Sequence, residues 1–103
     1  MDKQRTINVA VQVLPLVEDA FPVIARAIEV IQRSGVKYEV GPLETTLEGD
    51  DLDLLLSVAR DAHLACFEAG ARQVVTLIKI ADSLAGTTID EKVGKYRGQD
   101  ATP

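Results

Sequence analysis

Hydrophobic and polar residues alternate along the chain from Thr6 to Leu14. One set of alternate positions is apolar and the other is polar or small: Ile7, Val9, Val11 and Val13 against Asn8, Ala10 and Gln12. A period of two is typical of a strand with one buried face. We therefore predict a strand over this stretch, and Pro15 should end it.

Helical spacing replaces the alternation after Pro22, a residue that a helix tolerates only in its first turn. The apolar residues then recur three and four positions apart, at Ile24, Ala27, Ile28 and Ile31. Glu18 and Asp19 lie where acidic groups favour a helix N-terminus. Gly35 fits the position just after a helix C-terminus, so the pattern predicts a helix that ends there.

A pair of short strands and a second helix are predicted next. The stretch Val36–Val40 alternates, Gly41-Pro42 breaks it, and a second strand follows over residues 45–48. Asp50 or Asp51 is suited to cap the helix that comes after. The apolar stripe of that helix and the glycine that closes it are Leu52, Leu55, Leu56, Ala59, Ala62, Cys66 and Gly70.

The last predicted strand covers residues 72–80 and is apolar on both faces. One face carries Val74, Ile78 and Ile80, and the other carries Val75 and Leu77. Strands that are apolar on both faces usually lie inside a sheet, so we expect a central position. Beyond it, Thr88 with Glu91 fits a capping box for a short helix that contains Val93 and Tyr96, and residues 98–103 look like a frayed tail.

The element order is β-α-β-β-α-β, which predicts an α+β fold of ferredoxin-like type. In this fold, a four-stranded antiparallel sheet carries two helices on one face. The chain of 103 residues is expected to form one domain. The other sheet face is left bare, and a short chain buries only a modest core. We therefore expect self-association into a homodimer or homotetramer.

Composition and charge exclude several classes of function. The formal net charge is -5, and no cluster of Lys and Arg is present, which argues against nucleic-acid binding. One cysteine allows neither an internal disulfide nor a Cys-rich metal site. We find neither a basic leader nor an apolar run long enough to cross a membrane, so the expected location is the cytoplasm, with no membrane partner.

Candidate catalytic residues are few, and each has a structural explanation. His63 flanks the core stripe of the second helix, and Cys66 lies on that stripe, where a free cysteine acts as a small hydrophobe. The serines lack a nucleophile-elbow context. The dense acids around Asp51 fit helix capping. We therefore expect no catalytic residue, no metal site and no cofactor.

The segment Gly41-Pro-Leu-Glu-Thr-Thr-Leu-Glu-Gly49 is the most unusual in the chain. Thr45 supplies a hydroxyl and Glu48 a carboxylate on a short, rigid backbone. Such groups suit the recognition of a heterocycle with ring nitrogens and an amino group. The alternative is an edge strand on which Glu48 is simply solvated, and the residues alone do not separate the two.

The sequence resembles the small thiamine-binding protein family, which are single-domain relatives of the YkoF-like hydroxymethylpyrimidine/thiamine-binding proteins. The resemblance covers roughly residues 7–96 and keeps the order and spacing of the family motifs throughout. Its matching positions are Val13-Leu14-Pro15-Leu16, Tyr38-Glu39-Val40-Gly41-Pro42-Leu43-Glu44-Thr45, Glu48-Gly49, Ala62-His63 and Lys79-Ile80. The chain departs from the family pattern at Val17, Glu44 and Ala81.

This resemblance implies a ferredoxin-like fold in dimers or dimers of dimers, and binding of thiamine or its pyrimidine part without catalysis. The expected ligand-binding residues are Thr45, Glu48 and Leu43, completed by Asn8 and Gln12 if these two line the same cavity. Ring stacking would come from Tyr38, from Leu43 or from a neighbouring subunit. An acidic protein without a phosphate-binding loop should prefer free thiamine to its diphosphate.

Two other interpretations remain open at this stage. In the first, the chain is a structural or regulatory homo-oligomer whose ligand pocket has decayed, as the changes at Glu44 and in the first loop would allow. In the second, it is a small ferredoxin-like enzyme, such as an isomerase or a monooxygenase. No acid–base pair or nucleophile can be named for the second.

Overall fold

The computed structural model describes residues 5–85, 89 and 94. Six elements follow one another in this part of the chain. They are β1 (Ile7–Pro15), α1 (Phe21–Arg33), β2 (Lys37–Val40), β3 (Thr45–Gly49), α2 (Leu52–Glu68) and β4 (Val74–Asp82). The predicted β-α-β-β-α-β order is thus confirmed.

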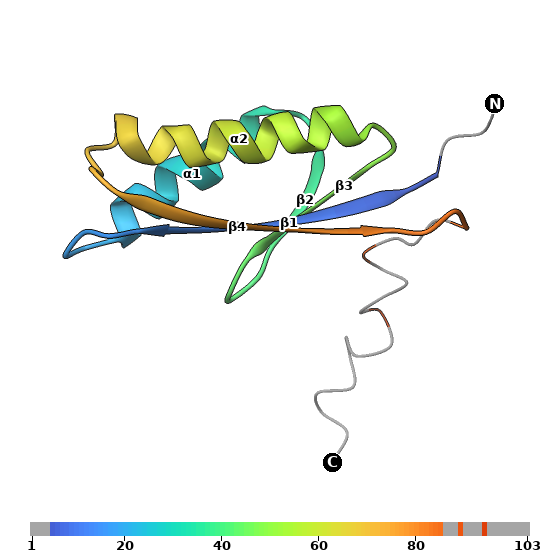
Figure 1. Ribbon diagram of the computed structural model, residues 1–103, viewed down its shortest axis with the longest axis horizontal. Helices are drawn as coiled ribbons and strands as arrows, with labels where there is room; N and C mark the ends of the chain where they lie inside the picture. Colours follow the sequence, from blue (N-terminus) through green and yellow to red (C-terminus); the bar gives the residue numbers. More distant parts are fainter. Residues whose placement is uncertain (1–4, 86–88, 90–93, 95–103) are drawn as a thin grey trace, which may run out of the picture.

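The strands form one antiparallel sheet in the order β2-β3-β1-β4. Both helices lie on the same face of this sheet, as Figure 1 shows. The fold is therefore an α+β sandwich of ferredoxin-like type, with two helices on one face, as the sequence predicted. We call the opposite side of the sheet the open face.

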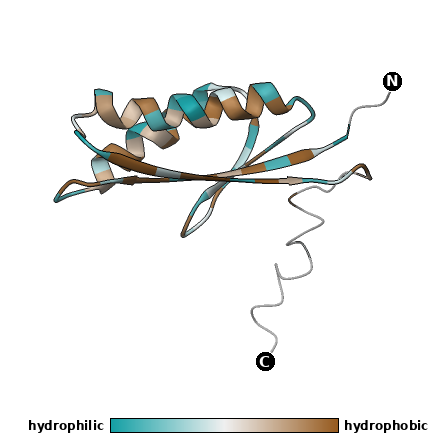
Figure 2. Cartoon of the chain, viewed as in Figure 1, coloured by the Kyte–Doolittle hydropathy of each residue, from teal (hydrophilic) through white to brown (hydrophobic). Residues whose placement is uncertain are grey.

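The hydrophobic core lies between the sheet and the two helices. β1 and β3 contribute the residues that face the helices, among them Val9, Val11 and Leu47. Figure 2 shows the hydrophobic residues along β1. From α1 the core takes Val23, Ala27 and Ile31. From α2 it takes Leu55, Val58, Ala59, Ala62, Ala65 and Cys66. In the described part of the chain, this core contains no Phe or Tyr.

The first helix, α1, differs from the prediction in which residues it buries and in how its N-terminus is capped. Ile24 and Ile28 are only partly buried, because the core side of the helix is centred on Ala27. The N-cap is Ala20, no side chain caps it, and the first turn holds no acidic residue. Glu18 and Asp19 therefore belong to the preceding loop, and the expectation that they serve the helix N-terminus is wrong.

The second helix follows the prediction closely. Asp51 is its N-cap, and its Oδ1 accepts a hydrogen bond from the Leu54 N–H at 3.2 Å. Gly70, just beyond the helix, has a φ of 108°, a conformation that glycine adopts without strain. The Cys66 side chain is fully buried, and burial raises the pKa of its thiol. The prediction that Cys66 lies on the buried stripe of this helix is confirmed.

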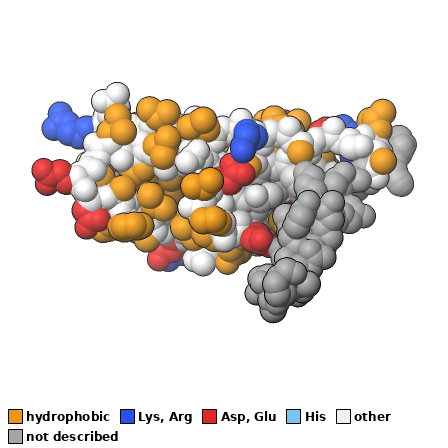
Figure 3. All heavy atoms as spheres, turned by 90° about the horizontal axis from the view of Figure 1, so that it is seen from below, with side chains coloured by type: hydrophobic (Ala, Val, Ile, Leu, Met, Phe, Trp, Pro, Cys, Tyr) orange, Lys and Arg blue, Asp and Glu red, His pale blue; other side chains and the backbone are white. Residues whose placement is uncertain are grey.

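The last strand lies at the edge of the sheet, so the expectation of a central position is wrong. β4 pairs only with β1, and its other edge has no strand beside it in the described part of the chain. Its apolar side chains remain exposed on both faces, at 46% for Val75, 47% for Leu77, 43% for Ile78 and 49% for Ile80. Hydrophobic side chains also gather over the open face, which is seen from below in Figure 3.

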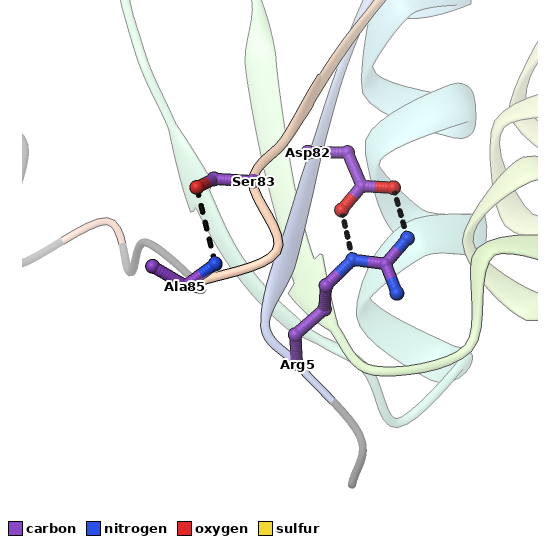
Figure 4. Close-up of polar contacts among 4 residues, drawn as sticks. All are labelled: Arg5, Asp82, Ser83 and Ala85. Carbon is purple, nitrogen blue, oxygen red and sulfur yellow. Dashed lines mark hydrogen bonds and ion pairs between the residues drawn. The ribbon is translucent and has the colours of Figure 1, made fainter. Parts of the chain in front are cut away.

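A bidentate ion pair joins the ends of β1 and β4. Arg5 Nε lies 2.6 Å and Nη2 lies 2.8 Å from the two carboxylate oxygens of Asp82 (Figure 4). The hydrogen bonds from Arg5 keep the pKa of Asp82 below its ordinary value, and the same contact raises the pKa of Arg5. Just beyond β4, the Ser83 hydroxyl accepts from the Ala85 N–H at 3.2 Å.

The predicted terminal helix and the tail lie outside the described residues. Ile89 is described, and it is buried, with its N–H donating to Glu48 Oε1 at 2.5 Å. Because Glu48 is on the open face, Ile89 covers part of that face. Among the residues described, no helix is both long and apolar enough to cross a membrane.

Candidate ligand-binding site

The loop between β2 and β3 is a tight hairpin turn. The Gly41 N–H donates to the Glu44 carbonyl oxygen at 2.9 Å, so that only Pro42 and Leu43 form the tip. A Cβ atom at position 41 would lie 3.0 Å from the same oxygen, which explains the glycine. Proline fixes φ at the first tip position. The Gly-Pro entry therefore makes a short and rigid turn.

A cavity of about 390 Å³ lies beside this turn, between the end of β1 and the first helix. We call it the helix-side cavity. Its walls include residues 40–45 of the hairpin, residues 11–14 of β1, and Phe21, Ile24 and Ile28 of α1. The volume falls in the range of small-molecule sites, roughly 300–1,000 Å³, which are mostly apolar with a few polar groups. Phe21 is 83% exposed and Leu43 is 76% exposed, so both remain open to a ligand.

Thr45 supplies a polar group to the helix-side cavity. It pairs with Val11 on the helix-facing side of the sheet and is only 6% exposed. No residue in the described part of the chain forms a hydrogen bond with its hydroxyl. A hydroxyl that lines a cavity and has no protein partner there is a group that a ligand can satisfy.

A second cavity, of about 290 Å³, lies on the other side of the hairpin turn. We call it the open-face cavity. Its lining includes Asn8, Glu39, Thr46 and Ile89, and it shares residues 41–44 with the helix-side cavity. Asn8 is 3% exposed, and its Oδ1 has no hydrogen-bond partner among the residues that the structure describes. The turn is therefore a common wall between two cavities on opposite faces of the sheet.

Glu48 is held by three groups on the open face. Its Oε2 lies 3.1 Å from Lys37 Nζ, and its Oε1 accepts from the Ile89 N–H at 2.5 Å and from Asn8 Nδ2 at 3.5 Å. Burial raises the pKa of this carboxylate, but the three hydrogen bonds and the charge of Lys37 outweigh burial, and the net pKa lies below its ordinary value. Glu48 is therefore a paired carboxylate and not a solvated one.

The structure does not bring the five predicted site residues into one cavity. Thr45, Leu43 and Gln12 line the helix-side cavity, and Leu43 and Asn8 line the open-face cavity. The Gln12 side chain alternates with Val11 and Val13 and so shares the open face with Asn8. Glu48 lies in the lining of neither cavity, although it contacts Asn8. The alternation of Thr45 and Glu48 along β3 places their side chains on opposite faces.

The sequence interpretation missed the contribution of the first helix to the site. Ile24 and Ile28 were assigned to the core, yet they line the helix-side cavity. The aromatic residue in this lining is Phe21, whereas Tyr38 lines neither cavity. Phe21 stands directly before Pro22, at the first position of the helix. The signal available in the sequence was an aromatic residue next to the proline that begins the helix, which is outside the apolar stripe predicted for the core.

Glu44 is one of the positions at which the chain departs from the family pattern. Its carboxylate is directed away from Thr45. Glu44 Oε1 lies 3.0 Å from Lys79 Nζ, on β4. Lys79 is opposite Ala10 on the open face, so this ion pair crosses that face. Glu44 lines both cavities, but its charge is directed toward Lys79 and not toward the hydroxyl of Thr45.

The potential catalytic groups are engaged in packing. His63 Nδ1 lies 2.6 Å from Thr76 Oγ1, and its ring meets the Phe67 ring edge-on at 5.4 Å between centroids. Cys66 is buried beneath the helix and lines neither cavity. Within the part of the chain that the structure describes, no group of three His, Cys, Asp or Glu side chains could hold a metal ion.

The fold and the cavity beside the hairpin define a class of small ferredoxin-like α+β domain with a ligand-sized apolar pocket. The chain belongs to the thiamine-binding protein family, whose model matches residues 9–97. A UPF0045 protein of Clostridium perfringens is 48% identical over 94 residues, which cover 89% of this chain and 98% of that protein.

Solved structures agree with this assignment. A domain of unknown function from Bacillus cereus is 48% identical and superimposes with a TM-score of 0.84, covering 93% of this chain and 94% of that one. A provisional thiamine biosynthesis/salvage protein of Thermotoga maritima is 39% identical, with a TM-score of 0.79, and the match covers 89% of this chain and 99% of that one. The resemblance noted in the sequence is thus confirmed at the level of family and fold.

Proposed function

We propose that the protein binds thiamine, or its hydroxymethylpyrimidine part, in the helix-side cavity and does not transform it. The observation that carries this proposal is the combination of an apolar cavity of about 390 Å³ with Thr45, a residue that is 6% exposed, lines this cavity and makes no side-chain hydrogen bond within the described part of the chain. Membership of the thiamine-binding family supports the ligand class. The rigid turn at Pro42 lowers the ordering cost of binding.

The cavity walls suit the parts of such a ligand. Phe21 and Leu43 offer apolar surface on which a flat ring can pack, and the Thr45 hydroxyl can donate to or accept from a ring substituent. The net charge of -5 favours the cationic thiazolium over phosphorylated forms. We therefore expect free thiamine to bind more tightly than its diphosphate.

The open-face cavity is the other candidate location for the same ligand. The specific observation in its favour is the unpartnered Oδ1 of Asn8, which could accept a hydrogen bond from an amino group. In that arrangement, Glu48 would orient Asn8 by accepting a hydrogen bond from its Nδ2. Gln12 would add a second polar side chain to the same face of β1. Thr45 and Asn8 distinguish the two locations because each lines one cavity, whereas Leu43 lines both.

We propose no catalytic step. His63 is hydrogen-bonded to Thr76, and Cys66 is buried away from both cavities, so neither supports acid–base or nucleophilic chemistry on a bound ligand. Thiamine recovered after prolonged incubation with the protein should be chemically unchanged. A thiamine product identified by mass spectrometry would contradict this part of the proposal.

We further propose that β4 pairs with a second copy of the chain. This strand has nine residues, exposed apolar residues on both faces and an edge that no strand of the described part of the chain pairs with. A long apolar edge of this kind readily adds another strand. Pairing of two β4 strands would make them central in a continuous sheet, which would explain why both faces of β4 are apolar.

A thermal-shift screen tests the binding proposal. Thiamine, its monophosphate and diphosphate, and hydroxymethylpyrimidine are compared at equal concentrations. A ligand that binds only the folded chain raises the melting temperature. We expect shifts with thiamine and hydroxymethylpyrimidine and a smaller one with the diphosphate. The absence of any shift would favour the alternative of a structural or regulatory oligomer with an unused cavity.

A further inference from the structure

The central strand β1 extends beyond the strand on one of its sides. β3 pairs with β1 only as far as Val11 opposite Thr45, whereas β4 pairs with β1 as far as Pro15 opposite Val74. The last four residues of β1, from Gln12 to Pro15, therefore have a neighbouring strand on the β4 side alone. The hairpin turn around Leu43 lies on the other side, and the helix-side cavity separates the two.

The register shows which backbone groups face that side. The Leu16 N–H donates to the Gln73 carbonyl oxygen at 2.9 Å, in continuation of the β1–β4 pairing. In an antiparallel ladder, the groups of alternate residues point to the same neighbour. Residues 14 and 12 thus face β4, and Val13 and Pro15 face away from it. Proline, which has no N–H, is tolerated at a position where the ladder needs none.

Val13 consequently presents an N–H and a C=O to the helix-side cavity. In the part of the chain that the structure describes, β3 does not reach Val13, and no turn or loop hydrogen bond involves its N–H or C=O. Val13 is itself part of the cavity lining, and its surroundings are apolar residues such as Leu43 and Phe21. A backbone donor and acceptor in an apolar wall are costly when they remain unpaired. They are therefore groups that a ligand can satisfy.

We infer that the backbone of Val13 recognises the amino edge of a 4-aminopyrimidine, an inference that rests on the proposed function. In this arrangement, the Val13 carbonyl oxygen accepts from the exocyclic amino group. The Val13 N–H donates to the adjacent ring nitrogen. The N–H and C=O of one extended residue point in the same direction, and the ligand edge offers a donor beside an acceptor. The ring then packs between Phe21 and Leu43, close to the hydroxyl of Thr45.

This assignment makes Val13 a determinant of ligand chemistry through its backbone and not through its side chain. A 4-oxopyrimidine presents an acceptor where the amino group has a donor, so in the same pose its oxygen would oppose the Val13 carbonyl. Discrimination by a mismatched polar edge is usually much stronger than discrimination by a missing methylene group. The cavity should therefore select for the amino group itself.

The test compares Val13→Pro with Val13→Ala by calorimetric titration of thiamine. Proline removes the N–H and spares the ladder with β4, while alanine keeps the N–H and removes most of the side chain. We expect Val13→Pro to weaken binding about tenfold or more, and Val13→Ala to weaken it less than about threefold. Equal affinities of the two variants would overturn the inference and leave the proposed function intact.

A ligand variant makes the same test without any mutation, in case Val13→Pro fails to fold. The 4-oxo analogue of thiamine is titrated into the unmodified protein beside thiamine itself. We expect it to bind about tenfold more weakly or worse. An analogue that binds as well as thiamine would overturn the inference alone. Failure of thiamine to bind the unmodified protein would overturn the proposed function and this inference with it.

Discussion

Val11 and Thr45 form the last residue pair between β1 and β3, and the helix-side cavity begins where this pairing stops. β1 has nine residues and β3 has five, so the sheet leaves a gap at this end. The hairpin turn and α1 enclose the gap without filling it. The candidate site thus follows from unequal strand lengths around a rigid Gly41-Pro42 turn.

The stability of the fold should depend on the ionisation of Glu48. Its pKa is lower in the folded chain than the ordinary value of 4.5. Ionised Glu48 therefore stabilises the fold above about pH 4.5, and this contribution is lost as the pH falls through the folded-state pKa. In urea titrations, Glu48→Gln should be less stable than the unmodified protein at about pH 7, and the difference should shrink toward about pH 3.

The matched control for this experiment is Lys37→Met, which keeps the carboxylate and removes its cation. Because Lys37 helps to lower the pKa of Glu48, this variant should show a weaker dependence of stability on pH between about 3 and 5. A difference between Glu48→Gln and the unmodified protein that stays constant over this range would contradict the ionic role of Glu48.

Cys66 should be inert in the native protein. Its side chain is fully buried and its pKa is raised by burial, so the thiol is neither accessible nor ionised at neutral pH. A thiol reagent should label the chain rapidly in urea and only slowly in buffer. Cys66→Ala should lower the free energy of unfolding by roughly 1 kcal/mol and leave thiamine binding unchanged. Rapid labelling of the folded protein would disprove the buried assignment.

The assembly proposal predicts that a charge on β4 produces monomers. Sedimentation of the unmodified protein at micromolar concentration should report two or four chains of 11.1 kDa. Ile78→Lys places a charge on the exposed edge strand and should reduce the mass. Leu54→Lys changes a similarly exposed residue on α2 and serves as the control for the β4 interface. A monomeric unmodified protein would leave the exposed apolar residues of β4 unexplained.

Glu44→Gly tests whether the departure from the family pattern harms the site. Because the Glu44 carboxylate pairs with Lys79 on the open face, its removal should leave thiamine affinity equal or slightly improved. An exposed ion pair of this kind contributes about 0–1 kcal/mol to stability. Lys79→Met removes the same ion pair and keeps Glu44. A large loss of binding in Glu44→Gly alone would show that the carboxylate itself serves the ligand.

Periodicity predicted the elements of this fold because each one has a clear apolar face. The alternation from Ile7 to Val13 and the stripe from Leu55 to Cys66 match the buried faces of β1 and α2. The position of β4 was not predictable from the same signal. A strand that is apolar on both faces can be buried within one chain or against another, and a single sequence does not distinguish these cases.

The candidate site was predicted only in part. The Gly41–Gly49 segment was found through its turn residues, and it does contribute Leu43 and Thr45 to the helix-side cavity. Phe21 and the backbone of Val13 were missed. The first is brought to the site by the packing of α1, and the second carries no side-chain signal, because its role depends on where β3 ends. The sequence pattern therefore did not predict how α1 packs beside the hairpin or at which residue the pairing of β1 with β3 ends.

The central claim is that thiamine binds in the helix-side cavity, and calorimetric titration of matched variants tests it most directly. We predict saturable binding by the unmodified protein in the micromolar range, about -8 kcal/mol. Thr45→Val, which replaces the hydroxyl with a methyl group, should weaken binding by roughly 0.5–1.5 kcal/mol, while Asn8→Ala on the opposite face should leave it unchanged. Loss of binding in Asn8→Ala with full affinity in Thr45→Val would contradict the account and place the ligand in the open-face cavity.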